Sequence, residues 1–177
     1  MKLRLMDLPE MHPCLLWDDI VLAAAAVLKD LAPTVRHQLN LDIENVPLYE
    51  SELLAMEIVA SGVPADALAK VRRTYEPHRL VELAAIAIAG MALFQAGGHQ
   101  IRDVALRGSS ADYLVDDAGH LLEVAGRSRR NDLAAAWQVR WNRLAARQES
   151  GFYVCVIEFE TPAGRLAFAA SDEGETA

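Results

Sequence analysis

The sequence predicts an α/β protein of the α+β kind, in which helices flank a mixed sheet and a helical region precedes it. Three observations support this prediction. The segment 78–96 is apolar on every side, which is typical of a buried helix. Apolar and polar residues alternate over 101–107 and on both sides of a turn at 116–119, which indicates strands and a hairpin. A helical pattern over 131–148 then leads into the apolar run 152–159.

Length and composition favour one folded unit of ordinary size. The chain has 177 residues, of which 53% are hydrophobic and 24% charged, so it has enough apolar surface for a buried core. We divide it into a helical N-terminal region, 1–76, and an α/β core, 77–177, and expect the two to pack together as one compact unit. The net charge of −8 excludes a protein that is basic throughout, so any nucleic-acid surface must be local.

The distribution of cysteines and apolar runs favours a cytoplasmic protein. Cys14 and Cys155 lie far apart in the sequence and do not have metal-ligand spacing, so we expect reduced thiols. The first residues carry charges and prolines where a signal peptide would need an apolar run. The apolar run 20–28 is too short to span a bilayer, so we expect no membrane partner.

The N-terminal region is predicted to be mainly helical. Pro33 ends an alanine-rich helical pattern, and Gly62 ends a second one. We expect helices at 14–31, 51–61 and 63–75, and short extended stretches at 2–5 and 39–43.

The core is predicted from helix boundaries and from alternation. Pro77 opens one helix, Gly97 and Gly98 close it, and Gly126 is expected to end the second hairpin strand. We expect helices at 78–96 and 131–148, strands at 101–107, 152–159 and 165–169, and a hairpin of strands 113–115 and 121–125 around the turn 116–119.

Two acids are placed where the hairpin can bring them together. Asp112 stands at the entrance of the first hairpin strand, and Glu123 lies in the middle of the second. Side chains alternate between faces along a strand, so Glu123 and Ala125 share one face. Converging carboxylates suit a hard cation such as Mg²⁺ or Mn²⁺, which we expect to bind weakly.

Asp112, ten intervening residues and then Glu123-Val124-Ala125 resemble the PD-(D/E)XK pattern of the restriction-endonuclease-like superfamily. The resemblance covers roughly residues 84–169 and implies that superfamily's mixed sheet with flanking helices. It implies that the two carboxylates hold a metal, while a lysine positions and activates the attacking water. Ala125 replaces that lysine, so the chain resembles a degenerate member. Some relatives carry a further acid on the preceding helix, which makes Glu82 either a third metal ligand or an ordinary first-turn helix acid.

The segment after the hairpin is locally basic. It carries six arginines and one aspartate between residues 126 and 147, a local charge of +5. We predict a nucleic-acid-binding face made by Arg127, Arg129, Arg130, Arg140, Arg143 and Arg147. Arg127 and Arg129 are also the basic residues nearest to the missing lysine, so the predicted catalytic set is Asp112, Glu123 and Arg127. Lys70 is the other candidate for a relocated basic group.

Three functions compete at this stage. The first is a catalytically impaired nuclease-like domain that binds DNA or RNA or serves as an assembly subunit. The second is an active Mg²⁺-dependent endonuclease or exonuclease with a relocated basic residue. The third is a protein-interaction module without a nucleic-acid role, whose helical half binds a protein partner or a second copy of the chain. If the site is an open cleft, Ala125→Lys should restore the motif.

Overall fold

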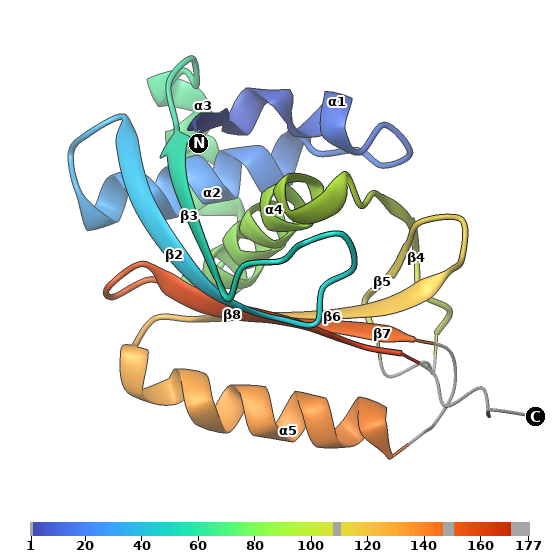
Figure 1. Cartoon of the computed structure of the whole chain (residues 1–177). Helices are drawn as coiled ribbons and strands as arrows, with labels where there is room; N and C mark the ends of the chain where they lie inside the picture. The colour runs from blue at the N-terminus through green and yellow to red at the C-terminus, as the bar shows by residue number, and fades with distance from the viewer. Residues whose placement is uncertain (1, 108–110, 147–150, 171–177) are drawn as a thin grey trace, which may run out of the picture.

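The computed structural model describes residues 2–107, 111–146 and 151–170, so the predicted site residue Arg147 lies outside the described part. The prediction of a mixed α/β fold is confirmed by helices packed on a mixed sheet (Figure 1). The α-helices are α1 (Leu8–Met11), α2 (Asp18–Leu31), α3 (Ala65–Thr74), α4 (Pro77–Gly97) and α5 (Leu133–Ala145). The strands are β1 (Lys2–Arg4), β2 (Arg36–Glu44), β3 (Leu53–Val59), β4 (Ile101–Val104), β5 (Tyr113–Val115), β6 (His120–Arg127), β7 (Phe152–Glu158) and β8 (Ala163–Ala169). Short 3₁₀ turns cover Leu5–Asp7 and Arg130–Asp132.

All eight described strands belong to one sheet, in the order β1-β3-β2-β8-β7-β6-β5-β4. Strands β4, β5 and β6 form an antiparallel meander. Strand β7 then lies parallel to β6, and this requires the crossover that α5 provides. Beyond β7, the sheet continues through an antiparallel β8 and a parallel β2.

The sheet is covered on both faces, as Figure 1 shows. Helices α1 to α4 lie on one face, and α5 lies alone on the other. Alternate residues of β6 separate accordingly, because Leu122 and Val124 pack in the larger core with α2 and α4. Leu121 and Ala125 pack in the smaller core beneath α5. The strand therefore presents Glu123 to the α5 side.

The prediction of a helix over 51–61 is wrong, because this segment forms β3. Its residues Leu54, Met56 and Ile58 are buried in alternation and pair with β2. Leucine, alanine, methionine and glutamate all favour helices in isolation, but sheet pairing overrides that weak preference here. The expectation of a mainly helical N-terminal region is corrected with it, since β1, β2 and β3 extend the sheet past β8.

Gly126 lies inside β6 and does not end it, contrary to the prediction. A Cβ atom at this position would lie 2.3 Å from the Val81 carbonyl oxygen of α4. Only glycine lets the strand pass this close to the helix backbone. The close approach fixes the first turns of α4, and with them Glu82, beside β6.

Helix α4 is the central helix of the larger core. Most of its residues from Leu80 to Ala96 are buried, as the apolar pattern predicts. By length and composition it is apolar enough to cross a membrane, but 72% of its most apolar stretch is buried inside the protein. Among the described residues it is the only helix with this property.

Candidate functional site

One polar cavity brings together most of the predicted site residues. Its volume is about 400 Å³, and it opens between α4, the β4–β5 edge, β6 and α5. Its carboxylates are the three that the sequence singles out, and two of its three arginines belong to the predicted basic face. The lining residues are Arg79, Glu82, Ile86, Val104, Asp112, Tyr113, Glu123, Val124, Arg140 and Arg143.

The cavity exists because β5 covers only the first part of β6. Their pairing runs from Val115 opposite His120 to Tyr113 opposite Leu122. Beyond that point Asp112 takes the place of a strand partner, since its Oδ2 atom accepts the Val124 N–H at 2.9 Å. The backbone N–H of Asp112 also donates to the Leu122 carbonyl at 2.9 Å. These two bonds, made to the residues on either side of Glu123, hold the Asp112 carboxylate at the uncovered edge of β6.

Glu123 points toward α5 and contacts two arginines of that helix. Glu123 is only 3% exposed, and its Oε1 atom forms ion pairs with the Arg140 and Arg143 guanidiniums. The Arg140 Nε atom lies 3.4 Å from Oε1, without hydrogen-bond geometry. The Oε2 atom is buried and has no hydrogen-bond partner among the described residues. A buried carboxylate oxygen without a partner is costly, so a bound water or a cation would stabilise it.

Glu158 shows that burial of an acid does not by itself leave an oxygen free. It is the other fully buried acid among the described residues. Its Oε2 atom accepts the N–H groups of Glu160 and Thr161 at 2.8 and 3.0 Å, and Oε1 accepts the Thr161 hydroxyl. Glu158 therefore caps the β7–β8 turn, whereas the buried Oε2 atom of Glu123, a residue of the cavity lining, has no hydrogen-bond partner in the described part of the chain.

The charges around the cavity act on one another. Burial raises the pKa of Asp112, although the guanidiniums of Arg140 and Arg143 act in the opposite direction and Glu82 adds to the rise. Asp112 as a residue is exposed, so its carboxylate lies at the cavity mouth with protein around only part of it. Burial, and then the nearby charge of Arg127, lowers the pKa of Arg140. Glu82 forms an ion pair with Arg79 at 3.0 Å.

The carboxylates fit Mg²⁺ or Mn²⁺ only in a limited way. The described residues contain no group of three or more His, Cys, Asp or Glu side chains that could hold a metal ion together. Mg²⁺ commonly binds through one or two carboxylates and keeps several waters, and the Oε2 atom of Glu123 has no hydrogen-bond partner among the described residues. Asp112 and Glu123 are thus the residues that would hold such an ion, and Glu82 lines the same cavity.

The other predicted basic residues lie outside the cavity lining. Arg127 donates from Nη1 to the Gly126 carbonyl at 2.7 Å and is half-buried. Arg129 and Arg130 are exposed at the end of β6. Lys70 lies on α3, where it pairs with Asp66 at 3.8 Å, and α3 packs on α2. The structure therefore brings Arg140 and Arg143 to the acids, not Arg127 or Lys70.

Ala125 does not face an open cleft. It is 3% exposed and packs beneath α5 with Ala136, Trp137 and Val156. The condition under which Ala125→Lys was expected to restore the motif is therefore not met. Trp137 stacks on Trp141, with ring centroids 5.5 Å apart, and belongs to the same core.

Arg79 and Tyr113 are lining residues that the sequence did not identify as part of the site. Arg79 has the appearance of an ordinary first-turn helix residue, and Tyr113 that of a strand residue. The nearest sequence signal is position, because Arg79 precedes Glu82 by three residues and so lies on the same helix face.

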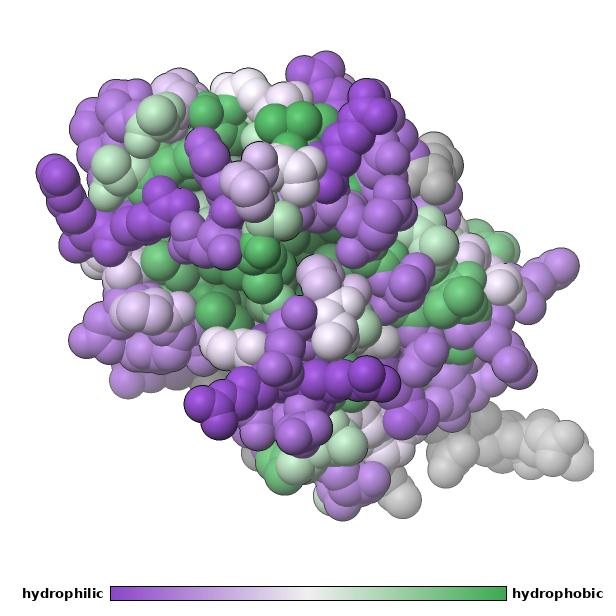
Figure 2. All heavy atoms as spheres, turned by 90° about the vertical axis from the view of Figure 1, so that its left-hand side faces the viewer, coloured by the Kyte–Doolittle hydropathy of each residue, from purple (hydrophilic) through white to green (hydrophobic). Residues whose placement is uncertain are grey.

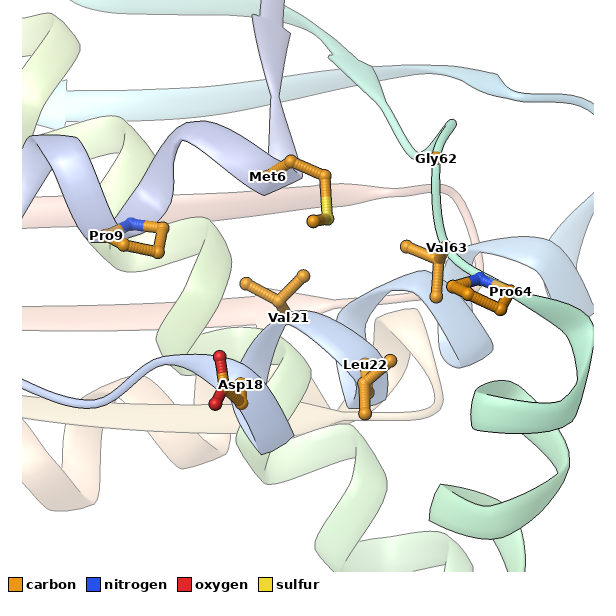
Figure 3. A pocket seen from close by; sticks show the side chains of 8 residues that line it. All are labelled: Met6, Pro9, Asp18, Val21, Leu22, Gly62, Val63 and Pro64. Atoms are coloured by element: carbon orange, nitrogen blue, oxygen red, sulfur yellow. The ribbon is translucent and has the colours of Figure 1, made fainter.

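Another cavity, of about 380 Å³, also brings opposite charges together, since Asp42, Glu44 and Glu52 line it with Arg165, but it contains none of the residues that the sequence predicts for the site. One of about 210 Å³ is mostly apolar and lies between the N-terminal turns, α2 and the loop before α3 (Figure 3). Asp18 is its only charged lining residue. A further cavity of about 470 Å³ is lined by Val27, Leu31, Leu80 and Phe159 together with polar residues. Figure 2 shows the left-hand side of Figure 1, where apolar side chains lie within a hydrophilic border.

Searches of family models, of curated proteins and of solved structures each find no match to this chain.

Proposed function

We propose that this chain is a degenerate member of the restriction-endonuclease-like PD-(D/E)XK superfamily that binds nucleic acid and cleaves it slowly or not at all. The observation that carries this proposal is that Glu82, Asp112 and Glu123 line one cavity together with Arg140 and Arg143. The order α4, β4, β5, β6, α5, β7 agrees with the fold that the resemblance implies.

The residues of the cavity suit binding better than hydrolysis. Arginine is a strong phosphate ligand because its guanidinium presents several donors in one plane. It stays protonated near neutral pH, so it is a poor general base. A bound Mg²⁺ ion would supply charge stabilisation and an activated water. In this chain Asp112 and Glu123 provide carboxylate oxygens, while the third motif position holds a buried methyl group.

The locally basic segment after β6 supports a nucleic-acid ligand. Arg129 and Arg130 are exposed, and Arg143 has a side chain that is 49% exposed. They lie on the segment with local charge +5 in a protein whose overall charge is −8. A nucleic acid, with its negatively charged phosphodiester backbone, is the polymer that such a basic segment would recognise.

Salt-dependent binding tests the proposal. We expect fluorescently labelled single-stranded DNA or RNA to bind the wild-type protein and to be released between about 50 and 200 mM salt. The double variant Arg129→Ala/Arg130→Ala should bind more weakly and show a shallower salt dependence. Arg73→Ala is the single-site control, because it removes one exposed arginine from α3.

No binding of either polymer at low salt would contradict nucleic-acid binding. That result would favour the protein-interaction module, whose partner would then be sought on the arginine face. Equal binding by the wild type and by the Arg129→Ala/Arg130→Ala variant would contradict the assignment of Arg129 and Arg130 to the binding surface.

A further inference from the structure

We propose that Arg143 is a displaceable cation on Glu123, and that a divalent cation and a phosphodiester group therefore bind this cavity cooperatively. The cation replaces the Arg143 guanidinium on the carboxylate, and the released guanidinium then binds the phosphodiester. This inference rests on the proposed function and concerns how its site is regulated.

Glu123 needs a positive partner in any state. Its side chain is 4% exposed, and a buried carboxylate without a positive partner is strongly destabilising. Arg140 and Arg143 meet this need through the same oxygen, Oε1. The second oxygen, Oε2, is buried without a hydrogen-bond partner among the described residues, so it is available to a cation that takes the place of Arg143.

The two arginines differ in how firmly they are held. Arg140 has a side chain that is 20% exposed, and its Nη1 atom donates to the Ala136 carbonyl at 3.2 Å. Arg143 has a side chain that is 49% exposed. Half of that side chain is already in water, so Arg143 can leave Glu123 without exposing a core. Arg143 is therefore the exchangeable partner, and Arg140 is the permanent one.

The charge balance of the cavity couples the two ligands. Its lining residues carry three carboxylates (Glu82, Asp112, Glu123) and three guanidiniums (Arg79, Arg140, Arg143). A phosphodiester alone must compete with Glu123 for the arginines. A divalent cation alone must bind beside guanidiniums that repel it. When both bind, the cation neutralises Glu123 and the phosphodiester neutralises Arg143, so each ligand removes the obstacle to the other.

This coupling must be reciprocal, because each ligand changes the affinity of the other by the same factor. Couplings between protein sites typically lie between about 5-fold and 150-fold. We expect about tenfold here, since one ion pair is exchanged at a partly exposed position.

The coupling can be measured with Mn²⁺ alone and with a thymidine dinucleotide that contains a single phosphodiester. Free Mn²⁺ is followed by electron paramagnetic resonance during titration of the protein, and a titration without protein corrects for Mn²⁺ held by the dinucleotide. In the wild type, saturating dinucleotide should raise the Mn²⁺ affinity about tenfold. In Arg143→Gln, Mn²⁺ should bind more tightly than to the wild type without dinucleotide, and the dinucleotide should change that affinity little.

Arg73→Gln is the matched control, since it removes one exposed arginine on α3, away from the cavity lining, and it should behave as the wild type. Circular dichroism melting identifies any variant that does not fold, and Arg143→Lys then serves as a second variant with weakened coupling. The inference is overturned if the Mn²⁺ affinity of the wild type is unchanged by the dinucleotide, or if Arg143→Gln retains the full coupling. If longer strands still bind in a salt-dependent way in that case, the proposed function survives without this inference.

Discussion

At the scale of single residues, the cavity brings two groups of side chains together. The sequence predicts its acids as a metal site, but assigns its arginines to a separate nucleic-acid-binding face. Asp112 and Glu123 were identifiable because strand alternation and a short turn dictate which residues of a hairpin meet. The pairing of Glu123 with Arg140 and Arg143 could not be identified in the same way. Helical periodicity shows which residues share one side of a helix, but not where that helix lies over a sheet. That position depends on how Trp137 and Leu144, the buried residues of α5, pack on the sheet.

Burial of Ala125 makes a clear prediction about the missing lysine. Ala125→Lys should lower the free energy of unfolding by about 2–4 kcal/mol more than Ala125→Met, because only lysine brings a charged group under α5. Both substitutions add volume to the same tight site, so methionine controls for overpacking. Urea unfolding of the two variants measures the difference. A lysine variant as stable as the methionine variant, with new metal-dependent cleavage, would show that the position opens into the cavity.

The raised pKa of Asp112 predicts a pH-dependent stability. Since its pKa is higher in the folded protein, the folded state binds the proton more tightly than the unfolded chain does. The stability associated with Asp112 is therefore greatest below the unfolded pKa, near about pH 4, and falls as the pH rises through the folded pKa. Asp112→Asn keeps an oxygen that can accept the Val124 N–H and removes the charge.

We therefore expect Asp112→Asn to be more stable than the wild type at neutral pH and to lose this advantage toward about pH 4. Thermal melts of both proteins across that range test the sign. An advantage that grows as the pH falls would mean that the arginines outweigh desolvation at this carboxylate.

At the scale of elements, some segments adopt the secondary structure that their local sequence favours. Others adopt the structure that pairing with a distant strand imposes. The helix over 78–96 and the hairpin around 116–119 were predicted because their signals are long or specific to a turn. Strand β3 was not, since its residues favour a helix in isolation and acquire their strand form from β2. The role of Gly126 was equally hidden, because nothing in the local sequence reveals that a helix backbone passes over it.

Gly126→Ala tests how closely α4 and β6 are held. The new Cβ atom would meet the Val81 carbonyl oxygen at 2.3 Å, so strand and helix must separate. We expect a loss of about 1–3 kcal/mol in unfolding free energy, and weaker Mn²⁺ binding as Glu82 and Glu123 move apart. Ala134→Ser, on the exposed side of α5, is a control that should change neither. Wild-type stability in Gly126→Ala would show that the two elements adjust without cost.

At the scale of the whole molecule, one sheet runs through both regions into which the sequence was divided. Strand β2 pairs with β8 over Asn40–Glu44 and Ala163–Ala167, more than a hundred residues apart in the chain. Periodicity marks β2 as extended but does not name its partner. The N-terminal strands thus lengthen a sheet whose other end carries the cavity, and helices α1 to α4 share one core with both parts.

Cleavage by the purified protein tests the central claim most directly. Plasmid DNA and labelled single strands of DNA and RNA are incubated with Mn²⁺ and wild-type protein, Asp112→Asn or Glu123→Gln. Loss of a water-positioning group typically slows such chemistry by about 10²–10⁴-fold. We expect wild-type protein to retain the strands yet to cut them no faster than Asp112→Asn does. Efficient cutting by the wild type that both variants abolish would contradict the degenerate site and identify an active nuclease.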